Sequence, residues 1–158
     1  MADSQDIRSV MVPISGGHII LPNATVAEVV AYSPPEPVNN GPDWLLGTFL
    51  WRGWQVPVVS YSLLTESAES EATNGARLCI TKSLIGNERM PYVAILAQGF
   101  PRLTTVTSDN LTEVPLESKP IAVAGKVIVD STEALVPDID RLSHLVAHAA
   151  FGALPLTS

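Results

Sequence analysis

The fold is decided by residues 45–59, which read LLGTFLWRGWQVPVV. Two runs rich in Val, Leu and aromatic residues meet at Arg52-Gly53. This pair fits a two-residue hairpin turn, because glycine readily adopts the positive φ angles that such turns need. The pattern predicts two antiparallel strands, one over residues 45–51 and one over residues 54–61.

The predicted turn presents Arg52 between Trp51 and Trp54. Arg and Trp are the residue types most enriched at binding hot spots, and an indole face can hold a guanidinium by a cation–π contact. Two interpretations stay open: a tip that binds a partner, or a surface arginine over core tryptophans. Gly47 and Gly53 are interpreted as conformational residues. Pro57 inside a strand indicates an edge or bulge position.

Short apolar runs separated by turn residues continue on the N-terminal side of this hairpin. Residues 10–14 alternate as a strand does, and Gly16-Gly17 predicts a tight turn into a second strand over residues 18–21. Asn23 is a possible cap for a short helical stretch that carries Val26, Val29 and Val30. Four prolines between residues 33 and 42 predict an extended loop, because proline interrupts helices and central strands.

Residues 65–75 contain no large apolar side chain, so we expect a solvated linker there. It divides the chain into approximate halves, 8–66 and 76–137, joined by polar residues 67–75. The second half repeats the rhythm of the first, with predicted strands at 78–80, 92–97, 102–107 and 123–130. The first two are expected to form a hairpin around Gly86-Asn87.

A single helix is expected at the end, over residues 138–151. Asp138 is its predicted cap, and apolar residues follow at helical spacing; they are Ile139, Leu142, Leu145, Val146 and Ala149. Gly152 and Pro155 are expected to stop it. The sequence therefore predicts a mainly β domain over residues 8–150, with about nine or ten strands arranged as two small barrels or a sandwich.

Composition limits the classes of partner. The net charge is −7, which disfavours nucleic acid and anionic membrane surfaces. The acidic start lacks the basic flank and apolar run of a secretory signal, and no apolar run reaches the roughly 18 residues of a membrane span. Cys79 is the only cysteine, so no internal disulfide is possible. These observations predict a cytoplasmic protein without membrane insertion.

Patterns of catalytic residues are absent from the sequence. Ser60 lies between Val59 and Tyr61 rather than in a GxSxG motif, and no glycine-rich phosphate loop occurs. His144 and His148 have a spacing that suits a metal, but no third ligand accompanies them, so a half-exposed helix face is favoured. Cys79 is expected to be a buried structural thiol. The sequence predicts no enzyme, no cofactor and no metal.

The segment 45–59 resembles the CheW family, the coupling proteins of bacterial chemosensory arrays. In that family a glycine is followed five residues later by an Arg-Gly turn and then by a Val-Pro-Val strand, as Gly47, Arg52-Gly53 and residues 56–58 are here. The resemblance extends over roughly residues 8–148. Leu50-Trp51 and Ser60-Tyr61 depart from the usual residues, which suggests a divergent member. An accessory member of a system that controls twitching pili fits these departures, and a chemotaxis system stays open.

The resemblance implies two intertwined five-stranded barrels and a non-catalytic adaptor. Its implied partners are the regulatory domain of a CheA-type histidine kinase, a chemoreceptor cytoplasmic hairpin and other CheW-like proteins. We expect Arg52 to orient a partner contact near the groove between the barrels. Its expected neighbours in this site are Val29, Val30, Leu50, Trp51 and Trp54. Glu28 either joins this site or only caps or pairs locally. The alternatives are a β-barrel binding module of another assembly and, less favoured, a β-rich hydrolase.

Overall fold

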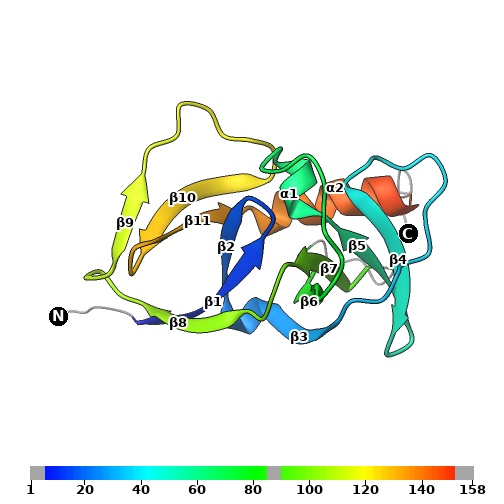
Figure 1. Cartoon of the computed structure of the whole chain (residues 1–158), viewed down its shortest axis with the longest axis horizontal. Coiled ribbons are helices and arrows are strands. Elements are labelled where there is room, and N and C mark those ends of the chain that lie inside the picture. The colour runs from blue at the N-terminus through cyan, green and yellow to red at the C-terminus, as the bar shows by residue number, and fades with distance from the viewer. Residues whose placement is uncertain (1–5, 85–89, 152–158) are drawn as a thin grey trace.

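The structure, a computed structural model, describes residues 6–84 and 90–151. Within these residues eleven strands and three helical segments follow one another as Figure 1 shows. The strands are β1 (Ile7–Ile14), β2 (Gly17–Pro22), β3 (Val26–Ala31), β4 (Leu45–Trp51), β5 (Trp54–Val59), β6 (Arg77–Lys82), β7 (Tyr92–Ala97), β8 (Arg102–Val106), β9 (Leu111–Val114), β10 (Val123–Val129) and β11 (Thr132–Pro137). The helical segments are η1 (Asn23–Thr25), α1 (Tyr61–Leu64) and α2 (Ile139–Phe151).

The strands form two sheets, which lie side by side along the long axis of the molecule (Figure 1). One has six strands in the order β8-β1-β2-β11-β10-β9, and the other has five in the order β3-β6-β7-β5-β4. We call them barrel A and barrel B. The mainly β class with paired barrels and a C-terminal helix is confirmed, although barrel A has one strand more than the five expected.

Each barrel takes strands from both sides of residues 67–75. Barrel A combines β1 and β2 with β8–β11, and barrel B combines β3–β5 with β6 and β7. The two approximate sequence halves therefore do not correspond one to one to the two barrels. The barrels are intertwined in the way the family resemblance implies.

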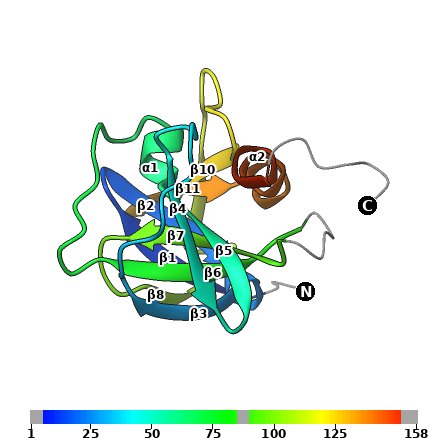
Figure 2. The same cartoon turned by 90° about the vertical axis from the view of Figure 1, so that its right-hand side faces the viewer.

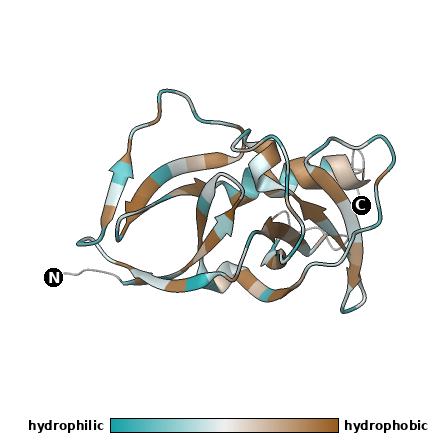
Figure 3. Cartoon of the chain, viewed as in Figure 1, coloured by the Kyte–Doolittle hydropathy of each residue, from teal (hydrophilic) through white to brown (hydrophobic). Residues whose placement is uncertain are grey.

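Three apolar cores hold this arrangement together. The largest lies between the barrels and under α2, and it includes Val10, Val12, Ile95, Cys79 and Leu142. The interior of barrel B includes Val56, Val58, Leu78 and Leu96, and that of barrel A includes Met11, Ile20 and Val127. Figure 3 shows hydrophobic residues concentrated on the strands and mostly hydrophilic connections between them.

Strand β1 separates two of these cores. Val10 and Val12 enter the core between the barrels, whereas Met11, on the opposite face, enters barrel A. The sequence alternation that predicted a strand is therefore correct, but both faces of the strand are buried. This is why β1 reads as a nearly continuous apolar run.

One predicted element is wrong. Residues 26–30 do not form a helical stretch capped by Asn23: a three-residue 3-10 turn ends at Thr25, and Val26–Ala31 is strand β3. Val29 packs against the core between the barrels and Val30 against the interior of barrel B. The spacing of valines 26, 29 and 30 fits one helix face, yet half-buried faces that pack against two different cores and β-branched side chains favour a strand.

Several boundaries differ from the sequence prediction. The second strand of the central hairpin ends at Val59, and Ser60 caps the short helix α1 by accepting a hydrogen bond from the Leu63 amide. Strands β9 and β11 were not predicted, because each is short and only partly apolar. The turn expected at Gly86-Asn87 lies outside the described residues.

The terminal helix is confirmed as α2. Asp138 accepts a hydrogen bond from the Arg141 amide at 3.0 Å, as an N-cap side chain does. Leu142 and Val146 are buried, and the rest of the predicted stripe packs against the same core. The expected stop signals, Gly152 and Pro155, lie outside the described residues. No helix in the described part of the chain is long and apolar enough to cross a bilayer.

The polar residues 65–75 are not a freely solvated linker, contrary to expectation. Glu71 accepts hydrogen bonds from the hydroxyl groups of Ser15 and Ser60 and from the amide of Gln98. Ser15 follows β1 of barrel A, whereas Ser60 and Gln98 follow β5 and β7 of barrel B. A single carboxylate therefore fastens this segment to both barrels.

Cys79 is fully buried in β6, and burial raises the pKa of its thiol to about 12. The unfolded chain loses this proton near pH 9, so the contribution to folding stability is complete below pH 9. It is lost as the pH rises from 9 to 12. We expect the free energy of unfolding to fall over this window, and to fall less steeply in a Cys79→Ala variant, by up to about 1.4 kcal/mol per pH unit. Urea titrations of both proteins at several pH values measure this difference.

Candidate partner-binding site

The hairpin between β4 and β5 has the predicted two-residue turn. Trp51 pairs directly with Trp54, and Arg52 and Gly53 have φ angles of 50° and 84°. Positive φ at both central positions is the geometry of a type I′ turn, which matches the twist of the flanking strands. Glycine suits its position, whereas an arginine at the other position is unusual. Figure 2 shows the tip of this hairpin near β3.

The Arg52 side chain is exposed but held in place. A guanidinium nitrogen lies 2.7 Å from a Glu28 carboxylate oxygen, and the guanidinium carbon lies 4.7 Å from the centre of the Trp51 ring. Trp51 in turn meets Tyr92 edge to face, with ring centres 4.9 Å apart. The Arg52 side chain remains 70% exposed, so most of its hydrogen-bond donors face solvent. The result is a pre-oriented cation on the surface of barrel B.

The ion pair joins the two ends of the five-stranded sheet. Glu28 lies on β3 and Arg52 follows β4, which are the two edge strands of this sheet. A few residues away, Glu36 and Thr48 exchange two backbone hydrogen bonds of 2.8 and 2.9 Å. Gly47 permits this contact: its φ is +146°, and a Cβ there would lie 2.3 Å from the Glu36 carbonyl oxygen. The site is thus built where barrel B closes.

The other residues predicted to surround Arg52 do not all lie at the hairpin tip. Leu50 and Trp54 are exposed near the tip, by 66% and 39%, and the pairing register puts them on opposite faces of the hairpin. Val30 lies on the same face of β3 as Glu28, but Val29 points into the core between the barrels. The hairpin tip therefore brings Arg52 together with Trp51, whose face Trp54 shares. Leu50 lies on the other face of the hairpin, and Val29 lies away from the tip.

Pro57 is buried, and its strand is not an edge strand. Strand β5 lies between β7 and β4, and its pairing with β7 begins only at Val58. On the β7 side, Pro57 therefore has no pairing partner among the described strands. The missing amide hydrogen of proline does not interrupt the sheet there. A bulge lies in the facing strand, between Leu45 and Gly47.

Two contributors to the site were not identified from the sequence. The role of Glu28 was left open, and the structure shows that it pairs with Arg52. Tyr92 was read only as the start of a strand, yet its ring supports Trp51. Both contacts join residues more than 20 positions apart, so no local pattern could have indicated them.

Replacing Arg52 with asparagine should separate binding from folding. Asparagine is favoured at this turn position, and an exposed ion pair contributes at most about 1 kcal/mol. We therefore expect Arg52→Asn to unfold in urea within about 1 kcal/mol of the unmodified protein, and Arg52→Ala to be the less stable variant of the two. A loss of several kcal/mol in Arg52→Asn would instead make Arg52 a structural residue.

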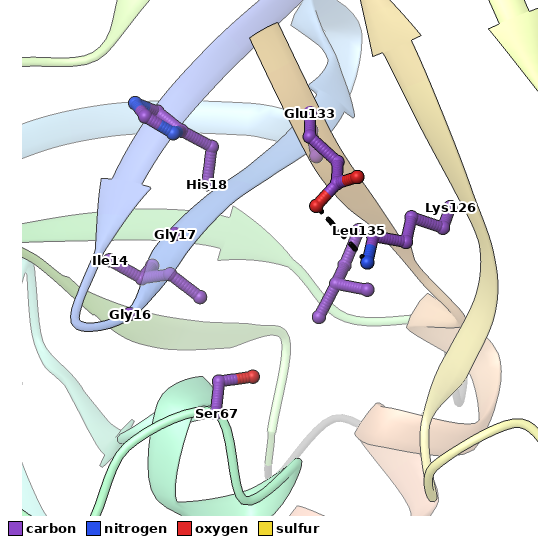
Figure 4. Close-up of a pocket in the computed structure, with 9 residues that line it drawn as sticks. Ile14, Gly16, Gly17, His18, Ser67, Lys126, Glu133 and Leu135 are labelled. Atoms are coloured by element: carbon purple, nitrogen blue, oxygen red, sulfur yellow. Dashed lines mark ion pairs between the residues drawn. The ribbon is translucent and has the colours of Figure 1, made fainter. Parts of the chain in front are cut away.

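A small hollow of about 120 Å³ opens elsewhere, on barrel A, beside the turn at Gly16. Lys126 and Glu133 form an ion pair of 3.1 Å across its wall, and Ser67 lies at its opposite side (Figure 4). The His18 ring points away from this pair. Because the two charges compensate each other, the hollow offers no unpaired charged group to a ligand.

The candidate catalytic and metal-binding residues have structural surroundings. Ser60 caps α1 and donates to Glu71, and no histidine is among its hydrogen-bond partners. His144 lies next to Asp140 on the exposed face of α2, with 3.7 Å between its ring nitrogen and the carboxylate. Among residues 6–84 and 90–151, no three His, Cys, Asp or Glu side chains are grouped to hold a metal ion.

Comparisons with known proteins bear on the family and the fold. The sequence profile described as CheW-like domain matches residues 8–147. Among solved structures, the chain is similar to the scaffolding protein TtCheW from Thermoanaerobacter tengcongensis, with a TM-score of 0.71, 14% identity and 86% of each chain covered. At this identity the structural likeness speaks for the fold alone. No curated protein matches the sequence.

Proposed function

The chain belongs to the CheW-like family, and from this premise we propose that it is a non-catalytic adaptor that couples chemoreceptors to a CheA-type histidine kinase. The observation that supports this most is the exposed Arg52, which Glu28 and Trp51 hold in one orientation. An arginine fixed in this way loses little conformational entropy when a partner binds. Such a residue suits a recognition site better than a flexible surface arginine does.

The chemistry of the hairpin tip indicates what it would bind. The guanidinium has five N–H donors in a planar fork, so it can bind a carboxylate or backbone carbonyl groups of a partner. Trp54, on the same face as Trp51, adds exposed apolar area, and Leu50 adds more on the opposite face of the hairpin. The kinase regulatory domain and the receptor cytoplasmic hairpin are the proposed partners, and other CheW-like proteins are further candidates. A mixed polar and aromatic contact of this kind is typical of a moderate hot spot.

In this proposal the protein works through geometry rather than chemistry. Residues 8–150 act as one CheW-like domain in the cytoplasm, recruited to receptors in the membrane. By binding one kinase–receptor arrangement better than another, the adaptor shifts the population towards that arrangement. The unusual Leu50-Trp51 and Ser60-Tyr61 pairs support a divergent member, which serves either a chemotaxis system or a system that controls twitching pili.

The test is reconstitution with the kinase and receptors encoded in the same genome. Receptor cytoplasmic fragments arrayed on vesicles are mixed with the full-length kinase, with and without the purified protein. We expect kinase to sediment with the vesicles only when the protein is present, and its autophosphorylation rate to change. Equal sedimentation with and without the protein, for both pilus and flagellar receptors, would refute the adaptor role. Coupling to pilus receptors alone or to flagellar receptors alone would decide between the two kinds of system.

A further inference from the structure

Strand β8 has an open edge in barrel A. It is the end strand of the six-stranded sheet, and among the described residues it pairs only with β1. The Thr105 carbonyl accepts a hydrogen bond from the Asn110 side chain at 2.9 Å, which indicates that this carbonyl points away from β1. Successive residues of a strand point their backbone N–H and C=O groups to opposite sides. Leu103 lies two residues before Thr105, so its amide N–H and carbonyl point to the same open side.

The open edge is short and has defined ends. Pro101, just before β8, has no amide hydrogen to offer, and Asn110 already occupies the Thr105 carbonyl. The Leu103 amide and carbonyl and the Thr105 amide remain for an added strand. The edge therefore accepts a short extended segment of about three residues and not a long strand.

Two of the most exposed apolar side chains in the described residues lie at this edge. Phe100 is 72% exposed and Leu103 is 71% exposed. The Arg77 guanidinium lies 4.1 Å from the centre of the Phe100 ring, and Arg8 pairs with Thr105 across the sheet. Exposed apolar side chains beside free backbone donors and acceptors are the features that a strand-adding partner uses.

The end of the edge near Phe100 and Leu103 carries basic side chains, although the net charge of the protein is negative, whereas Asp109 and Asp130 lie beyond its Thr105 end. Arg8, Arg77 and Arg102 are three of the nine basic residues in a chain of net charge −7. Within residues 6–84 and 90–151, none of the three forms an ion pair, whereas Arg52 and Lys126 do. Arg77 also has a buried Nε atom without a hydrogen-bond partner. No carboxylate of the described residues therefore pairs with these three guanidinium groups.

We propose that the β8 edge is a docking site for a short, extended, acidic segment of a partner protein. The segment adds to β8 through the Leu103 backbone, and its carboxylates bind Arg77 and its neighbours. Its apolar side chains cover Leu103 and Phe100. This site lies on barrel A, whereas Arg52 lies on barrel B, so the proposal does not rest on the adaptor role.

The test uses fluorescein-labelled hexapeptides and anisotropy with the full-length protein. A peptide of alternating Glu and Val should bind, and one of alternating Lys and Val should bind at least about tenfold more weakly. Leu103→Pro removes the outward amide hydrogen without removing a bond to β1, so this variant should stay folded by circular dichroism and lose binding. The double variant Arg77→Ala, Arg102→Ala should bind at least about fivefold more weakly.

Lys119→Ala is the matched control, since Lys119 is an exposed cation distant in sequence from β8; it should leave the affinity unchanged. Three results would each overturn the proposal. One is equal binding of the acidic and basic peptides, another is unchanged affinity in folded Leu103→Pro, and the third is no binding of the acidic peptide at millimolar concentration. The Arg77 and Arg102 double variant decides the matter if Leu103→Pro does not fold.

Discussion

Gly47→Ala is expected to lower the free energy of unfolding by about 3 kcal/mol and the thermal midpoint by roughly 6–12 °C. Two causes add together. The backbone at Gly47 has a φ of +146°, which side chains rarely adopt, and the new Cβ would lie 2.3 Å from the Glu36 carbonyl oxygen. Relief requires Glu36 to move, which breaks its two hydrogen bonds with Thr48. Scanning calorimetry measures the change.

Gly53→Ala is the matched control for this prediction. Its φ of +84° is also unfavourable for alanine, but no atom lies within 4 Å of the new Cβ. Only the conformational cost remains, about 1 kcal/mol. If the two variants lose equal stability, the close approach of residues 36 and 47 does not hold barrel B closed.

Glu71→Ala is expected to cost about 2–3 kcal/mol, which is large for a residue in a polar connection. The carboxylate accepts bonds from Ser15 at 2.6 Å and from Gln98 at 2.9 Å, and it also accepts from Ser60, which is fully buried. Alanine leaves the hydroxyl groups of Ser15 and Ser60 without this acceptor, whereas the Gln98 amide keeps the Ala72 carbonyl. Urea denaturation should show a lower midpoint, and proteolysis within residues 65–75 should become faster.

Glu69→Ala is the control for Glu71, because Glu69 is an exposed carboxylate of the same segment. It should remain within about 0.5 kcal/mol of the unmodified protein. Similar losses in both variants would mean that the segment responds to overall charge and that Glu71 does not fasten the barrels.

The class of fold and the central hairpin could be predicted from local patterns alone. The turn at Arg52-Gly53 and both flanking strands follow from residue type and spacing, and the structure confirms them within two residues. Strand β3 could not be predicted because its valines fit a helix and a two-sided strand equally well. The packing of its two faces against different cores, which only the tertiary structure supplies, decides between them.

The site could be predicted in part for the same reason. Arg52 and its two tryptophans are adjacent in the sequence, so a local pattern brings them together. The contacts with Glu28 and Tyr92 depend on how barrel B closes, and the role of Glu71 depends on how the barrels meet. Long-range pairing of polar side chains leaves no periodic trace in a sequence.

The affinity of Arg52→Asn for its proposed partners tests the adaptor site most directly. Isothermal titration calorimetry would compare this variant and the unmodified protein against the kinase regulatory domain and the receptor cytoplasmic hairpin, with Arg141→Asn on the exposed face of α2 as control. We predict a folded Arg52→Asn protein that binds at least one partner more weakly by about 1–2 kcal/mol, a roughly 5- to 30-fold change. Unchanged affinity for both partners would contradict the site.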